Sequence, residues 1–309
     1  MSFSSNVKQE VSQKIMEGND ARAELSALIQ MTSSLSFSSR GMTILVTVEN
    51  AAVARTIYRL VKDKYNSEIE LFVKKKMNLK KNRIYGLRIL SGAPVILTDL
   101  GIYSARGLLK KPLAKIVASE NNARAYLAGA FLAGGSINPP EKTDYHLEIT
   151  AANEEHAQFL KETMDRFYLN AKIIERRNKF IVYLKAAEKI SDFLRIIESE
   201  QCLFEYENIR IERDLANNIQ RLNNIDVANE MKAQSAANKQ LLDIEKIEKN
   251  HRYDQLDQKL KDVIDIRKEY PDSSLNELCG LLEGKTGKSV SKSGLRHRFI
   301  KIHEIAEEL

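Results

Sequence analysis

Hydrophobic residues along the chain follow helical and strand periods in an order that occurs twice. Residues 22–35 and 124–137 each open with Arg-Ala and continue as a mostly apolar helix that contains several small residues. A short strand-like segment follows each helix, at 43–50 and at 146–153, and both segments end in an asparagine suited to start another helix. This order predicts two copies of one structural unit about a hundred residues apart.

The remainder of each copy also matches. One amphipathic helical segment and two strand-like segments follow in both, at 51–65, 68–73 and 83–90, and again at 154–168, 171–175 and 180–184. Coincidence between two ordinary α+β segments is the alternative, and the preserved order and spacing favour a true repeat. The sequence therefore predicts an α+β fold with pseudo-twofold symmetry, built from repeats at about 20–112 and 122–212.

The first helix of the second copy is unusually rich in small residues, at Ala128, Gly129, Ala133 and Gly134. Glycine lowers helix stability by about 1 kcal/mol relative to alanine, so its presence indicates a close helix-to-helix approach. Ser26 and Ala27 stand at the corresponding place in the first copy. We therefore expect the two helices to pack together at the pseudo-twofold axis.

The end of the chain shows the pattern of a compact all-α unit. A helical stripe over 255–269 is followed by a capping-box sequence at 274–277, a glycine-containing turn at 284–287 and a basic helix from 291. Helix, turn and basic helix together predict a helix-turn-helix, whose second helix enters the major groove of DNA. The turn is longer than usual, which allows a winged or otherwise modified variant.

A segment rich in Asn, Gln and Ala joins these two regions, and its apolar spacing indicates a solvated helix rather than disorder. We therefore expect an N-terminal domain over 1–215, a helical linker over 216–250 and a helix-turn-helix domain over 251–309.

Composition restricts the class of protein. The 309 residues are 43% hydrophobic and 29% charged, which is typical of a soluble globular protein of two domains. The formal net charge of +6 favours anionic partners. Two distant cysteines, Cys202 and Cys279, suit a reducing cytosol and argue against a disulfide framework or a cysteine zinc site. Without a signal-peptide or membrane-spanning pattern, the expected location is the cytoplasm.

Positive charge is concentrated in the last helix. Between Lys285 and His303 there are six Lys or Arg residues and no Asp or Glu, which favours salt-dependent DNA binding over a merely solvated basic helix. Of Arg296 and Arg298, only one is expected to face the groove, and His297 is expected beside a phosphate rather than in a metal or acid–base role. The residues predicted to contact DNA are Ser274, Lys285, Lys288, Ser291, Lys292, Ser293, Arg296, His297, Arg298 and Lys301.

A second set of basic residues lies where the repeats predict hairpin tips. These residues are equally consistent with a residual DNA-binding saddle and with charge that serves solubility. The candidates for secondary DNA contact are Lys74, Lys75, Lys76, Lys80, Lys81, Arg83, Arg176, Arg177 and Lys179.

The repeated helix resembles the motif of the LAGLIDADG homing endonucleases, with the match at 127–135 and a weaker copy at 25–33. In those enzymes, the acidic residue before the final glycine binds a catalytic divalent metal. Here that position is Gly134 in one copy and Thr32 in the other. The resemblance therefore implies an inactive relative with no catalytic residue, metal or other cofactor.

With its C-terminal basic helix, the whole chain resembles the WhiA family of sporulation and cell-division transcription regulators. Membership implies a sequence-specific regulator that binds double-stranded DNA, with no enzymatic role, in the nucleoid-associated cytoplasm. Another transcription or division protein is a second expected partner, and a membrane is not. Because the pseudo-twofold lies within one chain, a monomer is expected, although an isologous dimer is compatible with the sequence.

Two other functions stay open at this point. The first is a metal-dependent nuclease or maturase that recruits nearby acids, such as Glu141 and Asp144, in place of the lost ligands. The second is an interaction protein of the division machinery that uses DNA binding only for localisation.

Overall fold

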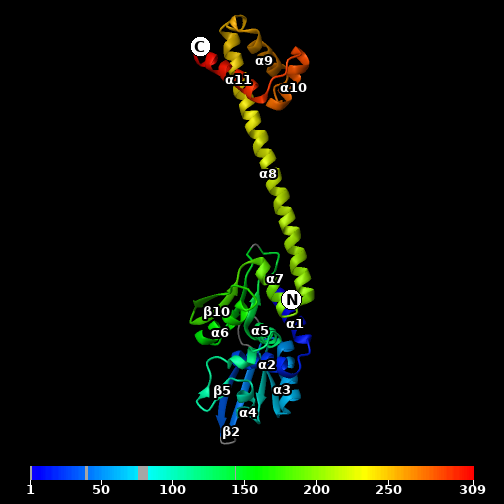
Figure 1. Ribbon diagram of the computed structural model, residues 1–309, viewed down its shortest axis with the longest axis vertical. Coiled ribbons are helices and arrows are strands. Elements are labelled where there is room, and N and C mark those ends of the chain that lie inside the picture. Colours follow the sequence, from blue (N-terminus) through cyan, green and yellow to red (C-terminus); the bar gives the residue numbers. More distant parts are fainter. Residues whose placement is uncertain (1, 39–40, 76–82, 143) are drawn as a thin grey trace. The chain divides into compact units, whose positions relative to one another are not determined.

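The computed structural model describes residues 2–38, 41–75, 83–142 and 144–309. The chain divides into two compact units, residues 1–213 and 214–309, and Figure 1 shows the elements of each. We call them the body and the C-terminal unit.

The first repeat of the body is a four-stranded antiparallel sheet with helices. Its strands lie in the order β1-β2-β4-β3, and Ile44 of β2 pairs with Ile89 of β4. The elements are α2 (Gly18–Thr32), β1 (Ser33–Ser38), β2 (Gly41–Val48), α3 (Ala51–Tyr65), β3 (Ile69–Lys75), β4 (Arg83–Ile89) and α4 (Ala93–Asp99).

The second repeat has the same topology, with strand order β7-β8-β10-β9. Its elements are α5 (Glu120–Gly134), β7 (Gly135–Ile137), β8 (Leu147–Thr150), α6 (Glu154–Asp165), β9 (Lys172–Arg176), β10 (Lys179–Leu184) and α7 (Ala187–Ile196). The short elements β5 (Tyr103–Ser104), β6 (Gly107–Leu108) and η1 (Ala114–Val117) connect the repeats. The predicted α+β repeat is therefore confirmed, and each copy also contains a first strand, β1 or β7, and a last helix, α4 or α7, that the sequence did not predict.

Side chains that cap helices account for much of this agreement. The Oδ1 atom of Asn50 accepts a hydrogen bond from Ala52 N at 2.8 Å, and that of Asn153 accepts one from His156 N at 2.9 Å. Each asparagine therefore satisfies a backbone donor at the start of its helix, as the sequence predicted. The second of these helices ends at Asp165, earlier than predicted, and Tyr168 just beyond it has a positive φ of 57°.

The helices α2 and α5 pack against each other, as their small residues predicted. A Cβ atom placed on Gly129 would lie 2.4 Å from the carbonyl oxygen of Glu24 and 3.1 Å from the Cβ of Ala27. No larger residue fits there without separating the two helices. Buried residues from both repeats form a single hydrophobic core around this contact.

An N-terminal helix that the sequence did not predict, α1 (Phe3–Gln13), joins the body. Phe3, Val7 and Val11 lie one turn apart and are buried in the core. On the same helix, Glu10 accepts hydrogen bonds from Gln201 N at 2.7 Å and Cys202 N at 3.0 Å. The start of α8 is thus capped by a carboxylate from the opposite end of the body sequence.

The C-terminal unit contains the later part of α8 (Glu200–Lys249), followed by η2 (Tyr253–Gln255), α9 (Gln258–Glu269), α10 (Leu275–Thr286) and α11 (Lys292–Glu307). A small separate core joins these helices, and Ile244 and Ile247 of α8 belong to it. The segment predicted as a linker is helical throughout, and residues 214–236 are exposed. Within the described residues, no helix has the length and apolar character required to cross a membrane.

Candidate nucleic-acid interface

The helix α11 is held against the C-terminal unit by one apolar face. Leu295, Phe299 and Ile302 recur at helical spacing and are at most 5% exposed. At its start, the Ser291 hydroxyl accepts a hydrogen bond from Gly294 N at 3.1 Å. Packing and capping together fix the helix, so its other side is presented to solvent in one orientation.

The solvent side of α11 carries five of the ten residues predicted to contact DNA. Lys292, Ser293, Arg296, His297 and Lys301 are all exposed. Arg298 is half-buried, on the opposite flank of the helix from Arg296. Of the two arginines, Arg296 is therefore the better placed to enter a groove.

The charges on this surface are largely unpaired. In the part of the chain that the structure describes, Lys288, Lys292, Arg296 and Lys301 form no ion pair. Lys285 differs, because its Nζ lies 3.0 Å from the Glu269 carboxylate, which raises the pKa of the lysine. Unpaired exposed cations are available to bind phosphates, whereas Lys285 must first leave its partner.

The helix α10, which precedes α11, is capped at both ends. The predicted capping box is confirmed, since Ser274 N donates to Glu277 Oε2 at 2.7 Å and Glu277 N donates to Ser274 Oγ at 3.3 Å. These hydrogen bonds lower the pKa of the Glu277 carboxyl. The predicted turn was placed too early, because Gly284 lies inside α10, which ends at Thr286 with Gly287 as its C-cap at a φ of 69°. The connection to α11 is 287–291, which is longer than the usual turn of three or four residues, as the sequence predicted.

A buried residue that the sequence did not reveal holds this arrangement together. Arg267 at the end of α9 is only 2% exposed, and burial lowers its pKa. Its Nη1 donates to the carbonyl of Ser273 at 2.7 Å, and its guanidinium lies 5.4 Å from the ring centroid of Phe299. Arg267 thus links the connection between α9 and α10 to α11. A basic residue in the last turn of a helix is too common a signal to have revealed this role.

The hairpin tips of the body also carry exposed basic residues. Lys74 and Lys75 end β3, and Lys75 pairs with Arg83 at the start of β4. In the second repeat, Arg176 and Lys179 flank a two-residue turn in which Arg177 has a φ of 53°. Three further candidates, Lys76, Lys80 and Lys81, lie outside the described residues.

The position that holds the metal ligand in the homing endonucleases does not fit a carboxylate here. A Cβ atom on Gly134 would lie 2.8 Å from both the Met31 Cε and the Thr150 carbonyl oxygen. In the other repeat, the Thr32 hydroxyl donates to the Leu28 carbonyl at 2.7 Å. Packing and helix hydrogen bonding therefore occupy both places, and no metal chemistry can be derived from them.

The alternative acidic ligands do not change this conclusion. Glu141 and Asp144 are exposed in the loop after β7. Over the described ranges, no group of three or more His, Cys, Asp or Glu side chains has a metal-binding arrangement.

Fold and surface together define a LAGLIDADG-like body followed by a helix-turn-helix unit. Three family models match the chain: the WhiA N-terminal LAGLIDADG-like domain over 19–103, the WhiA LAGLIDADG-like domain over 123–216 and the WhiA C-terminal HTH domain over 219–306. The chain belongs to the WhiA family.

Similar proteins extend over the whole chain. A protein from Lysinibacillus sphaericus named "Probable cell division protein WhiA" is 44% identical over 100% of this chain and 98% of its own length. A protein of the same name from Geobacillus thermodenitrificans is 46% identical over 100% and 96%. The crystal structure of full-length DUF199/WhiA from Thermatoga maritima is 25% identical, covers 100% of this chain and 99% of that one, and superimposes with a TM-score of 0.61.

Proposed function

We propose that this protein is a sequence-specific DNA-binding transcription regulator that acts in bacterial cell division. The C-terminal unit supplies the specific contacts by inserting the start of α11 into the major groove. We expect it to act as a monomer in the nucleoid-associated cytoplasm, because the pseudo-twofold of the body already lies within one chain.

One observation carries this proposal: α11 is fixed by its buried face while its opposite side presents exposed cations. Lys292 and Arg296 lie one turn apart near the helix start and form no ion pair within the described residues. In a helix-turn-helix, residues near the start of the second helix reach base edges. Arginine forms bidentate hydrogen bonds to guanine, and lysine binds phosphate as a point charge.

The test is fluorescence anisotropy of the full-length protein on genomic promoter DNA and on a scrambled duplex, over a series of salt concentrations. Lys292→Ala combined with Arg296→Ala is expected to weaken promoter binding by roughly 30-fold or more, since each contact contributes about 1–3 kcal/mol. The difference between promoter and scrambled DNA should shrink in the double variant.

A charge-matched control is available in the same unit. Lys246→Ala with Lys259→Ala removes two exposed lysines from α8 and α9 and is expected to change promoter affinity by less than about threefold. Equal losses in the two double variants would show that only total charge matters, and unchanged binding in the first would remove α11 as the DNA reader.

A further inference from the structure

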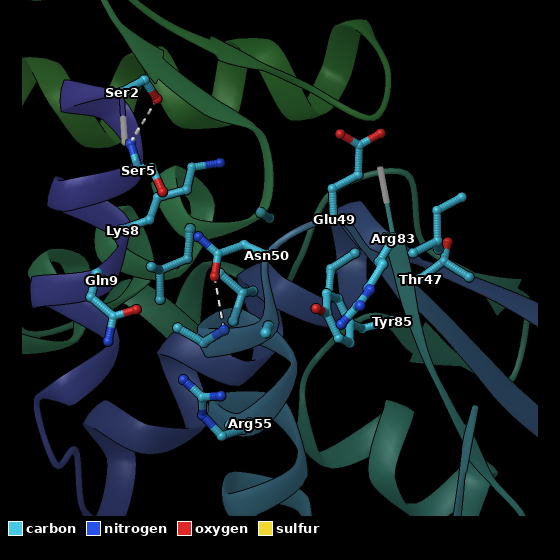
Figure 2. A pocket seen from close by; sticks show the side chains of 17 residues that line it. Ser2, Ser5, Lys8, Gln9, Thr47, Glu49, Asn50, Arg55, Arg83 and Tyr85 are labelled. Carbon is cyan, nitrogen blue, oxygen red and sulfur yellow. Dashed lines mark hydrogen bonds between the residues drawn. The ribbon is translucent and has the colours of Figure 1, made fainter. Parts of the chain in front are cut away.

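The body contains a polar hollow of about 1000 Å³ that the proposed DNA interface does not explain. It lies between α1, the junction of β2 with α3, the start of β4 and the C-terminal end of α5. Figure 2 shows Lys8 and Gln9 projecting from α1, with Arg83 and Tyr85 on the other side of the hollow. Its volume is that of a site for a small molecule.

Positive charge predominates in this hollow. Among the described residues that line it, three are basic, Lys8, Arg55 and Arg83, and one is acidic, Glu49. Arg55 and Arg83 are exposed and, among the residues that the structure describes, neither has an ion-pair partner. Cations that converge on one hollow without matching acids favour an anionic ligand.

Lys8 is the deepest of these cations. Its Nζ lies 5.9 Å from the ring centroid of Phe131, and burial lowers its pKa to about 8, an effect that Glu49 opposes. Removing an ammonium group from water is unfavourable unless an opposite charge is supplied nearby. A bound anion in the hollow would supply that negative charge more directly than the Glu49 carboxylate does.

Backbone N–H groups add to the positive electrostatic potential in the hollow. Ala51, Ala52 and Val53 form the first turn of α3 and line the hollow, so the positive end of this 15-residue helix faces it. The Ala52 N–H already donates to the Asn50 side chain, so Ala51 and Val53 would supply the backbone donors. Ser2 and Ser5, at the start of α1, line the hollow as well. Helix starts, hydroxyl groups and basic side chains are together the ordinary components of phosphate sites.

We propose that this hollow binds the phosphate group of a small, phosphate-bearing ligand, with Lys8, Arg55 and Arg83 as its cationic contacts and the start of α3 as a source of backbone donors. A DNA phosphate offers the same chemistry. The small ligand is favoured because Lys8 is recessed against Phe131, where a free phosphate ester reaches it more readily than the backbone of a duplex.

The test is isothermal titration calorimetry of the full-length protein with inorganic pyrophosphate, with ATP and, as a separate titrant, with a short DNA duplex. We expect saturable binding of at least one phosphate probe, with one site per chain. Arg55→Ala combined with Arg83→Ala should weaken it by at least about tenfold, since two charge-assisted contacts are lost.

A matched control removes two exposed basic residues elsewhere in the body, by Arg106→Ala with Lys111→Ala, and should leave phosphate binding unchanged. Lys8→Gln should also abolish binding, and a melting curve tests whether this variant is folded. If Lys8→Gln does not fold, the pair of exposed arginines still decides the question.

Two results would overturn the proposal. The first is phosphate binding that is equal in all variants. The second is no saturable binding of either phosphate probe, and a duplex that then loses affinity in the arginine variant would assign the hollow to DNA. Neither result depends on α11, so this proposal and the proposed function fail separately.

Discussion

The body and the C-terminal unit use their special residues in opposite ways. In the body, the small residues of the motif helices serve to pack the two repeats together. Gly129 allows α2 and α5 to touch, and Gly134 lies against Met31. In the C-terminal unit, helical Gly280 has nothing within 4 Å of the place its Cβ would occupy, and the polar side of α11 stays exposed. The difference fits the proposed function, in which the body serves as a scaffold and the C-terminal unit recognises DNA.

The two repeats of the body also differ from each other in their buried ionisable groups. The two repeats of the body carry Glu24 and Tyr126 at corresponding positions, and both are buried. Tyr126 Oη lies 2.7 Å from His156 Nε2, whereas Glu24 Oε2 has no hydrogen-bond partner within the described residues. The first repeat therefore retains a buried acid that the second repeat replaces with a satisfied pair.

The largest expected effect concerns the contact between the motif helices. Gly129→Ala should lower the free energy of unfolding of the body by roughly 3 kcal/mol or more, because the new methyl group meets the Glu24 carbonyl oxygen 2.4 Å away. Gly280→Ala is the matched control and should stabilise α10 by about 0.5–1 kcal/mol. Chemical denaturation measures both, and equal effects would contradict the close approach.

A smaller effect is expected from the pH dependence of stability. Burial raises the pKa of Glu24 to about 8, against an opposing attraction from Arg59. The folded state thus keeps a proton that the unfolded state loses above its ordinary pKa, so stability should fall as pH rises toward 8. The loss should be about 2–3 kcal/mol between pH 5 and pH 8.

Glu24→Gln isolates this contribution, because a neutral amide of similar shape does not titrate. Denaturation at several pH values should show a flatter stability profile for the variant, with its largest gain over the unmodified protein near pH 8. A variant profile parallel to the original would exclude Glu24 as the source.

Loss of the capping box at the start of α10 should lower the free energy of unfolding of the C-terminal unit by about 1 kcal/mol. Ser274→Ala removes the acceptor for Glu277 N at the start of α10, which should lower the free energy of unfolding by that amount. Asn276→Ala, at an exposed neighbouring position outside the box, is the control. If both substitutions lower the stability equally in thermal unfolding, the Ser274 cap makes no specific contribution to the stability of α10.

The smallest effect is expected at the hairpin tip of the second repeat. Arg176→Ala with Lys179→Ala should reduce affinity for promoter DNA by less than about threefold, because α11 carries the specific contacts. Anisotropy at fixed salt measures it. A loss as large as that of the α11 double variant would show that the body is an equal partner in DNA binding.

Local features of the structure were the most predictable from sequence. Asn50, Asn153 and Ser274 were identified as cap residues because their hydrogen bonds reach only two or three positions along the chain. The repeat was predictable because apolar spacing encodes each element twice. Contacts between distant segments were not, since nothing local relates Glu10 to the start of α8.

The candidate DNA-binding surface was predictable to a similar extent. The basic character of α11 is visible in the sequence, and the apolar spacing of Leu295 and Phe299 identifies its buried face. The ion pair of Lys285 with Glu269 and the burial of Arg267 depend on tertiary packing between helices, so the sequence did not reveal them. The hollow beside Lys8 was missed for the same reason, because four separate segments form it.

The central claim is that α11 reads bases, and a scan of base substitutions across the promoter site tests it most directly. Anisotropy of Arg296→Ala should show that discrimination at one base pair is lost, while Lys292→Ala should weaken binding uniformly across all the sequences. A preference profile that is identical for Arg296→Ala and the unmodified protein would contradict the claim, and would place specific recognition elsewhere in the chain.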